Sequence, residues 1–209
     1  MAYFPFFIDI EQKKCLVVGG GTVALRKVEV LLPYGAILIV VAPSIHEDII
    51  AMAKEDSSQL VLNKREFEDK DLDGIDFCIA ATQDEELNNR ISSICKQKNI
   101  LVNVVDVKEE CSFIVPAIIH NEAYDIAVSS GGKSPIAASY LKRRIRESIP
   151  QDYGVLVEQL GIYRDYVKEQ IPNQQIRAEV FRHLFDNGLE NNCNLTKDMV
   201  NEVVMQYMK

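Results

Sequence analysis

The sequence contains no tryptophan, no Cys-x-x-Cys pair and no long apolar run. Its five cysteines are odd in number and far apart, and its three histidines are equally scattered, so we expect free thiols and no metal site. No segment approaches the roughly 18–20 consecutive apolar residues of a membrane span. The N-terminus also lacks the basic leader of a secretory signal, and we therefore expect a cytoplasmic protein with no membrane partner.

Basic residues are in the minority as well. The chain has 23 Lys and Arg against 31 Asp and Glu, which gives a net charge of −8. This balance argues against a nucleic-acid partner bound by overall electrostatics. The 209 residues, 47% hydrophobic and 26% charged, suffice for one large globular domain or two small ones.

The first hundred residues alternate short β-branched runs with helical stretches, which is typical of a parallel sheet with crossover helices. Capping-box patterns at Ser44–Glu47 and Thr82–Glu85 predict the starts of two helices. We predict strands over 15–18, 37–41, 60–62, 77–81 and 101–105, and helices over 23–32, after the first capping box and over 87–98.

After Cys111 the pattern changes. Ser134 as N-cap and Pro135 as first residue predict a helix that ends near residue 148. We further predict strands over 113–119 and 125–129, and helices over 153–170, 173–186 and 196–208, with Asn187-Gly188 as a break. The expected fold is α/β: a Rossmann-type parallel sheet (1–112), a small α+β segment (113–149) and a C-terminal helical domain (150–209).

The strongest local motif is a G-x-G-x-x-A pattern, Gly19-Gly-Gly-Thr-Val-Ala24, between a strand and a helix. Gly19 permits the tight turn, Gly21 lets the backbone approach a pyrophosphate, and Ala24 lets the helix pack closely on the sheet. The N–H groups at the helix N-terminus would bind that anion. The alternative is a glycine-rich turn that binds no nucleotide.

The acidic residue that usually holds the ribose of NAD, about twenty residues after the glycines, is absent. The second strand ends in Val41-Ala42-Pro43-Ser44, and no Arg or Lys stands there to bind the 2′-phosphate of NADP. The ribose would then be held by the backbone and by Ser44. From these residues alone, the choice between NAD and NADP stays open.

Two further features could carry chemistry. Asp106 follows the fifth strand at the edge where open α/β sheets bind ligands, so it could take up a proton, touch a metal, or merely form a turn. The small-residue loop 129–135 precedes a helix that carries Lys142, Arg143, Arg144 and Arg146. Such a loop suits a substrate with carboxylates or phosphates, although a solvated basic helix face would look the same.

In order and spacing, these segments resemble the siroheme synthase family of precorrin-2 dehydrogenases and sirohydrochlorin ferrochelatases. The resemblance covers the whole chain and rests on several short stretches together. They are Phe4-Pro5-Phe6-Phe7, CLVVGGGTVALRK at 15–27, Val41-Ala42-Pro43, Ala80-Ala81-Thr82, Val102-Asn-Val-Val-Asp106, Cys111-Ser-Phe-Ile-Val-Pro116 and Ala127-Val-Ser-Ser-Gly-Gly-Lys-Ser-Pro135.

The resemblance implies an NAD-dependent oxidoreductase that converts precorrin-2 to sirohydrochlorin in siroheme or cobalamin synthesis. It implies Asp106 as catalytic acid or base, and Ser130, which is phosphorylated in some fused members, and Lys133 as substrate contacts. It also implies a homodimer formed through 113–149, with the C-terminal helices completing the substrate pocket. The implied cofactor contacts are Gly19, Gly21, Thr22, Val23, Pro43, Ser44 and Thr82.

Insertion of Fe²⁺ or Co²⁺ into sirohydrochlorin, the lyase activity of the same family, is left open by the sequence. Two alternatives to a dehydrogenase remain. One is a metal chelatase that uses the nucleotide-binding fold only as a scaffold. The other is a non-catalytic sensor of nucleotides or tetrapyrroles, because a fold does not dictate its chemistry.

Overall fold

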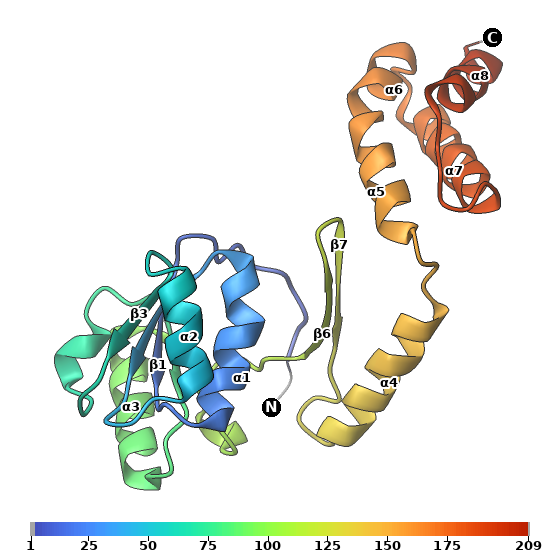
Figure 1. Ribbon diagram of the computed structural model, residues 1–209. Helices are drawn as coiled ribbons and strands as arrows, with labels where there is room; N and C mark the ends of the chain where they lie inside the picture. Colours follow the sequence, from blue (N-terminus) through green and yellow to red (C-terminus); the bar gives the residue numbers. More distant parts are fainter. Residues whose placement is uncertain (1–2, 209) are drawn as a thin grey trace. The chain divides into compact units, whose positions relative to one another are not determined.

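The computed structural model describes residues 3–208. The chain divides into two compact units, Met1–Val115 and Pro116–Lys209. The first unit holds a parallel sheet with its covering helices, and the second holds a β-hairpin and five helices among the described residues (Figure 1). The expected α/β class with a Rossmann-type sheet, a small α+β segment and C-terminal helices is confirmed.

The first unit is built on a five-stranded sheet with the strand order β3-β2-β1-β4-β5, in which every pairing is parallel. Its strands are β1 (Lys14–Val18), β2 (Ile37–Val41), β3 (Leu60–Asn63), β4 (Phe77–Ala80) and β5 (Leu101–Val104). The strand order reverses between β1 and β4. Open α/β sheets bind ligands outside the carboxyl ends of their strands at such a point.

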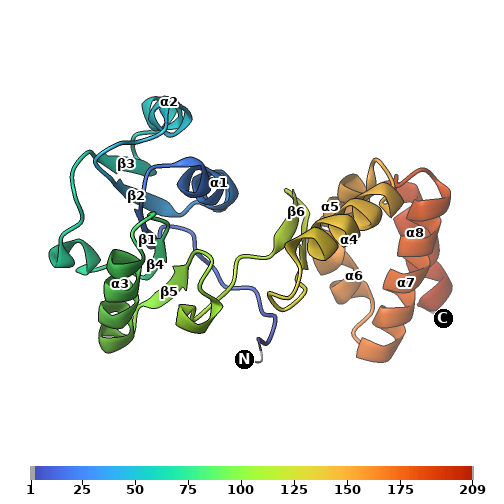
Figure 2. The same cartoon turned by 90° about the horizontal axis from the view of Figure 1, so that it is seen from below.

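Helices cover both faces of this sheet, with α1 and α2 on one face and α3 on the other (Figure 2). They are α1 (Thr22–Leu31), α2 (Glu47–Glu55) and α3 (Glu85–Lys98), with short 3₁₀ turns at Leu32–Tyr34, Asp69–Leu72 and Lys108–Glu110. In β1, Cys15 and Val17 pack in the apolar cluster with α1 and α2, whereas Leu16 and Val18 pack in the cluster with α3. Because successive side chains of a strand point to opposite faces, a strand buried on both sides is apolar throughout.

Both capping boxes predicted for the first unit are wrong in position. The cap of α2 is His46, whose Nδ1 accepts the N–H of Asp48 at 3.2 Å, and the cap of α3 is Asp84. Ser44 lies too early to cap α2. The His46 N–H bonds the carbonyl oxygen of Gly20 at 2.8 Å, so the helix begins only after His46.

The second unit begins with an antiparallel hairpin of β6 (Ala117–Asn121) and β7 (Tyr124–Val128). The first of these strands was predicted to start at residue 113. It starts later because the preceding segment runs beside β5 instead, where the Ser112 N–H bonds the carbonyl oxygen of Val102 at 2.7 Å. The next helix, α4 (Pro135–Ser148), has the predicted bounds, and the Ser134 hydroxyl accepts the Ala137 N–H at 3.2 Å as its cap.

The remaining helices pack around an apolar core that includes Leu156 and Leu184. They are α5 (Tyr153–Ile162), α6 (Arg164–Gln170), α7 (Gln174–Glu190) and α8 (Lys197–Tyr207). The single helix predicted over 153–170 is divided at Tyr163, and the break predicted at Asn187-Gly188 does not occur. A Cβ on Gly188 would lie 2.2 Å from Cδ1 of Leu156, so glycine serves close helix packing at this position.

In the part of the chain that the structure describes, no helix has both the length and the apolarity needed to cross a bilayer.

Candidate dinucleotide-binding cleft

The glycine-rich turn after β1 is held between the loops that follow β4 and β2. Gly19 has φ +122°, and a Cβ there would lie 2.3 Å from the carbonyl oxygen of Ala81. A Cβ on Gly20 would lie 2.1 Å from the carbonyl oxygen of Ser44. Both positions therefore require glycine. The G-x-G-x-x-A motif requires Gly19 and Gly21 but allows any residue at position 20. That position 20 is also glycine was the one sign in the sequence of this second close approach.

The N-terminus of α1 is open to an anion. Gly21 is its N-cap and makes no side-chain cap bond, and the first turn contains no acidic residue. Side chains cap α2, α3, α4, α7 and α8, whereas α5 and α6, like α1, have no side-chain cap. A Cβ on Gly21 would meet no atom within 4 Å. Because the first N–H groups of a helix need acceptors and lie at its positive dipole end, this turn fits a pyrophosphate.

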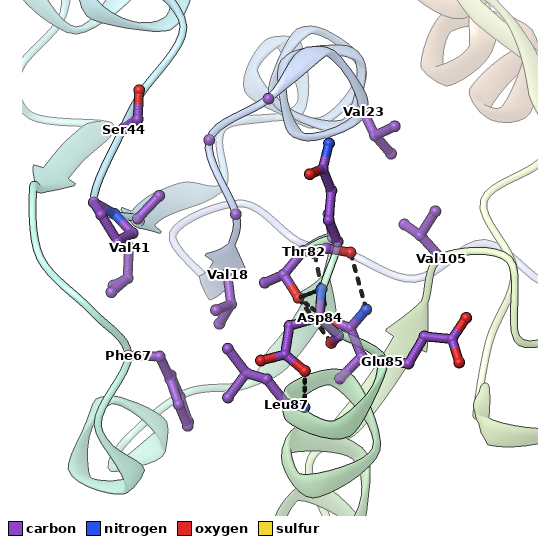
Figure 3. A pocket seen from close by; sticks show the side chains of 18 of the residues that line it. Val18, Val23, Val41, Ser44, Phe67, Thr82, Asp84, Glu85, Leu87 and Val105 are labelled. Atoms are coloured by element: carbon purple, nitrogen blue, oxygen red, sulfur yellow. Dashed lines mark hydrogen bonds between the residues drawn. The ribbon is translucent and has the colours of Figure 1, made fainter.

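A cleft of about 1460 Å³ opens at the carboxyl edge of the sheet. Val23, Thr82 and Val105 line one part of it, and Val41, Ser44 and Phe67 line another (Figure 3). Its size suits a dinucleotide better than a small metabolite. The cleft brings together most of the site residues expected from the sequence: Gly19, Gly21, Thr22, Val23, Pro43, Ser44, Thr82 and Asp106.

The loop between β4 and α3 is held by Asn88, which sequence reasoning missed. Asn88 is only 5% exposed, and its Oδ1 accepts the Thr82 N–H at 3.3 Å while its Nδ2 donates to the Thr82 carbonyl oxygen at 3.1 Å. The Thr82 hydroxyl lies 2.8 Å from Asn88 Oδ1 and accepts the Asp84 N–H at 3.1 Å. Thr82 therefore uses its hydroxyl and its backbone polar groups to shape the loop at the edge of the cleft.

Asp106 lies where its sequence position predicts, just beyond β5. The Val105 N–H bonds the carbonyl oxygen of Ala80 at 3.0 Å, which extends the pairing with β4 by one residue. Asp106 itself is exposed and has φ +62°, a left-handed conformation that Asp tolerates better than most residues. Within residues 3–208, no group of three His, Cys, Asp or Glu side chains could hold a metal ion.

Charge in the cleft is mainly negative. Its carboxylates are Glu66, Asp84, Glu85, Glu86 and Asp106. Arg90 also lines it, but its Nη2 bonds Asp69 Oδ1 at 2.7 Å. Among the described residues, no Lys or Arg lines the cleft next to Pro43 and Ser44, where the ribose of a dinucleotide would lie.

Ser130 and Lys133 belong to the second unit. The Ser130 hydroxyl donates to the carbonyl oxygen of Ser134 and accepts its N–H, both at 2.9 Å, so it closes the loop before α4. Gly131 and Gly132 take positive φ values inside this loop, and Lys133 is exposed at its end. Along α4, Glu147 pairs with Arg144 at 2.8 Å.

Three comparisons with known proteins agree with this geometry. A family model described as NAD(P)-binding matches residues 6–117, more than half of the chain. Siroheme synthase of Thioalkalivibrio sulfidiphilus is 41% identical over 186 residues, which are 89% of this chain and 38% of that protein. Siroheme synthase of Psychrobacter cryohalolentis is 40% identical over 189 residues, 89% of this chain and 35% of that protein. The chain thus spans less than two fifths of the length of these two curated relatives.

A solved structure described as SirC, precorrin-2 dehydrogenase, has a similar fold. It matches with a TM-score of 0.74 and 22% sequence identity, over 98% of each chain. Together with the glycine-rich turn, the uncapped α1 and the cleft, the family match leads to one assignment: the chain belongs to the NAD(P)-binding family whose model covers residues 6–117.

Proposed function

We propose that this chain catalyses the NAD-dependent oxidation of precorrin-2 to sirohydrochlorin in siroheme biosynthesis. The observation that carries the proposal is that Asp106 lines the same cleft as the uncapped N-terminus of α1. A group able to take up a proton thus lies beside a site for an anionic dinucleotide. The names of the curated relatives support the pathway, and the name of the solved structure supports the reaction.

In this reaction the substrate loses one hydride and one proton, and bound NAD⁺ supplies the acceptor for the hydride. The turn from Gly19 to Gly21 would hold the pyrophosphate at the first backbone N–H groups of α1, since the Gly19 N–H itself bonds the carbonyl oxygen of Val41 at 3.0 Å. Thr22, Val23 and Thr82 would border the dinucleotide, and Pro43 and Ser44 would lie beside its ribose. Asp106 accepts the proton, directly or through water.

NAD fits the cleft better than NADP. Pro43 and Ser44 offer no cation to a 2′-phosphate, and Glu66 adds a negative charge to the lining. The lining as a whole carries more carboxylates than cations, which disfavours a further phosphate. This argument from charge supports NAD as the acceptor.

The loop and helix that follow β7 suit a polycarboxylate such as precorrin-2. Lys133 is exposed in a loop whose shape Ser130 maintains. Lys142 and Arg146 add positive charge along α4, on a chain whose net charge is −8. We propose that Ser130 and Lys133 belong to the substrate-binding surface.

We also propose that the segment 113–149 forms a homodimer. Ile136 is 83% exposed on α4, and Tyr140 and Leu141 are exposed on the same helix. Exposed apolar groups of this kind mark surfaces that associate. Sedimentation velocity should give a dimer, and Ile136→Asp should shift it toward the monomer, whereas a monomeric parent chain would contradict this part of the proposal.

We place the protein in the cytoplasm. All five cysteines are buried free thiols, as expected for a reducing compartment. Cell fractionation tests this placement.

Metal insertion is the second candidate activity. Its support is the exposed carboxylate of Asp106, which could receive pyrrole protons as Fe²⁺ or Co²⁺ enters sirohydrochlorin. Stopped-flow absorbance with sirohydrochlorin and each metal separates the two activities, because a pure dehydrogenase leaves the spontaneous rate of insertion unchanged.

The decisive experiment mixes the purified chain with precorrin-2 and NAD. We expect NADH and sirohydrochlorin to form together, and we expect Asp106→Asn to lower kcat by about 10²-fold or more while NAD still binds. Glu109→Gln is the matched control, since Glu109 is an exposed carboxylate of the same loop. No turnover with either NAD or NADP would refute the proposed function.

A further inference from the structure

The loop that carries Asp106 closes around the side chain of Cys111. Cys111 is 8% exposed, and its Sγ accepts the N–H of Val104 at 3.2 Å. The same sulfur lies 3.2 Å from the carbonyl oxygen of Val104 and 3.3 Å from that of Val107. One thiol therefore bonds the backbone on both sides of Asp106.

Asn103 of β5 bonds the segment that follows Cys111. It is 7% exposed, and its Nδ2 donates to the carbonyl oxygen of Phe113 at 3.0 Å and lies 3.6 Å from the Cys111 sulfur. The Val102 N–H bonds the Ser112 hydroxyl at 3.3 Å. The two residues that follow Cys111 are thus bonded to β5, and these bonds fix the position of the thiol.

The thiol remains a hydrogen-bond donor because it stays protonated. Burial raises the pKa of Cys111, and this effect outweighs the opposing influences of the Val104 hydrogen bond and of Lys27. A protonated thiol is a poor nucleophile and is resistant to oxidation. The bonds of the thiol to Val104 and Val107, together with its protonated state, favour a positioning role over a reactive one.

Asp106 has a left-handed backbone conformation, which Asp tolerates better than most residues but which its surroundings must still hold. The bonds at Val104 and Val107 are two residues before Asp106 and one residue after it. Their loss would move its carboxylate relative to the cleft.

We propose that Cys111 is a positioning residue that keeps the Asp106 carboxylate at the cleft, an inference that rests on the proposed role of Asp106 in precorrin-2 oxidation. Cys111 acts through the backbone of Val104 and Val107 and contacts no ligand itself. A serine in its place can make the same bonds, whereas an alanine can make none of them.

The test compares Cys111→Ser, Cys111→Ala and Cys15→Ala. Cys15 is also a buried thiol of the first unit, but it packs only in the apolar cluster beside α1 and α2. We expect Cys111→Ala to lower kcat by about 10-fold to 100-fold with the KM for NAD unchanged. Cys111→Ser should restore most of kcat, and Cys15→Ala should leave kcat near that of the parent chain.

A second readout needs no turnover. Hydrogen–deuterium exchange should become faster over residues 104–107 in Cys111→Ala but not in Cys111→Ser. If the parent chain does not oxidise precorrin-2 while this exchange pattern holds, the proposed function fails and the loop-holding role of Cys111 survives. A kcat retained in Cys111→Ala, or lost equally in Cys15→Ala, would overturn the positioning role.

Discussion

The side-chain amide of Asn88 bonds both the N–H and the carbonyl oxygen of Thr82, at 3.3 Å and 3.1 Å. An amide can accept at one atom and donate at the other, whereas a carboxylate only accepts. This pair ties the first turn of α3 to the end of β4, and it sets the shape of the loop that borders the cleft.

Replacing Asn88 by Asp should therefore disturb the cleft and the fold together. The carboxylate cannot donate to Thr82 and would leave the carbonyl oxygen of this half-buried residue without its donor, at a cost of about 1 kcal/mol in the free energy of unfolding. We expect weaker NAD binding as well. Urea denaturation and calorimetric titration with NAD measure the two effects.

The matched control for this change is Asn89→Asp, because Asn89 is the next residue of α3 and is exposed. It should alter neither quantity. Equal effects of the two substitutions would mean that the bonds to Thr82 contribute neither to the free energy of unfolding nor to NAD binding.

Gly21→Ala should separate ligand binding from folding. The backbone there has φ −86°, which any residue can adopt, and the added Cβ meets no protein atom. Alanine is a poorer N-cap than glycine, so we expect a loss of about 1 kcal/mol or less in the free energy of unfolding. The Kd for NAD should rise about tenfold or more, because the methyl group occupies space needed by the pyrophosphate.

Gly20→Ala is the contrasting variant, since its Cβ would overlap the carbonyl oxygen of Ser44. It should destabilise the fold by about 2 kcal/mol or more. An unchanged Kd in Gly21→Ala would place the pyrophosphate elsewhere.

Cofactor preference should respond to charge at Ser44. Ser44→Arg supplies the guanidinium that a 2′-phosphate requires, so the ratio of kcat/KM for NADP to that for NAD should rise about 10-fold to 100-fold. Ser44→Gln, which adds length but no charge, should leave the ratio near its original value. If both variants behave alike, the 2′-hydroxyl does not lie beside Ser44.

Acid stability should depend on Asp71. Arg65 donates two bonds to its carboxylate, at 2.8 Å and 2.5 Å, and these bonds are the main reason that the pKa of Asp71 lies below its usual value. The folded state thus keeps this carboxylate ionised at a lower pH than the unfolded state does. Its contribution to stability is complete above the unfolded pKa of about 3.9 and is lost as the pH falls through the folded value.

In Asp71→Asn, the free energy of unfolding should consequently change less steeply with pH in acid. Urea denaturation from about pH 5 down to about pH 2 measures this slope, because the stability from a depressed carboxylate pKa is lost over that range. Asp73→Asn serves as the control, since the Asp73 side chain is 68% exposed and pairs with Lys98 at the surface. An unchanged slope in Asp71→Asn would show that the Arg65 pair does not stabilise the fold in this pH range.

Local patterns were enough to predict the fold and much of the cleft. Apolar runs of four or five residues separated by helical stretches predict a buried parallel sheet, because such strands are covered on both faces. Parallel strands place their carboxyl ends at one edge, so the sequence alone could bring Gly19 and Asp106 to the same side. The cap at Ser134 was equally readable, because a cap and its helix are neighbours in the chain.

Tertiary contacts decided the rest, because they join residues whose separation in sequence carries no periodic signal. Gly20 must be glycine because the loop after β2 returns against it, and α7 continues through Gly188 because Leu156 packs there. Asn88 looks like any polar helix residue until the fold places its amide at Thr82. The sequence marks Cys111 only as part of the stretch Cys111–Pro116, and only the folded loop brings its thiol to the backbone of Val104 and Val107.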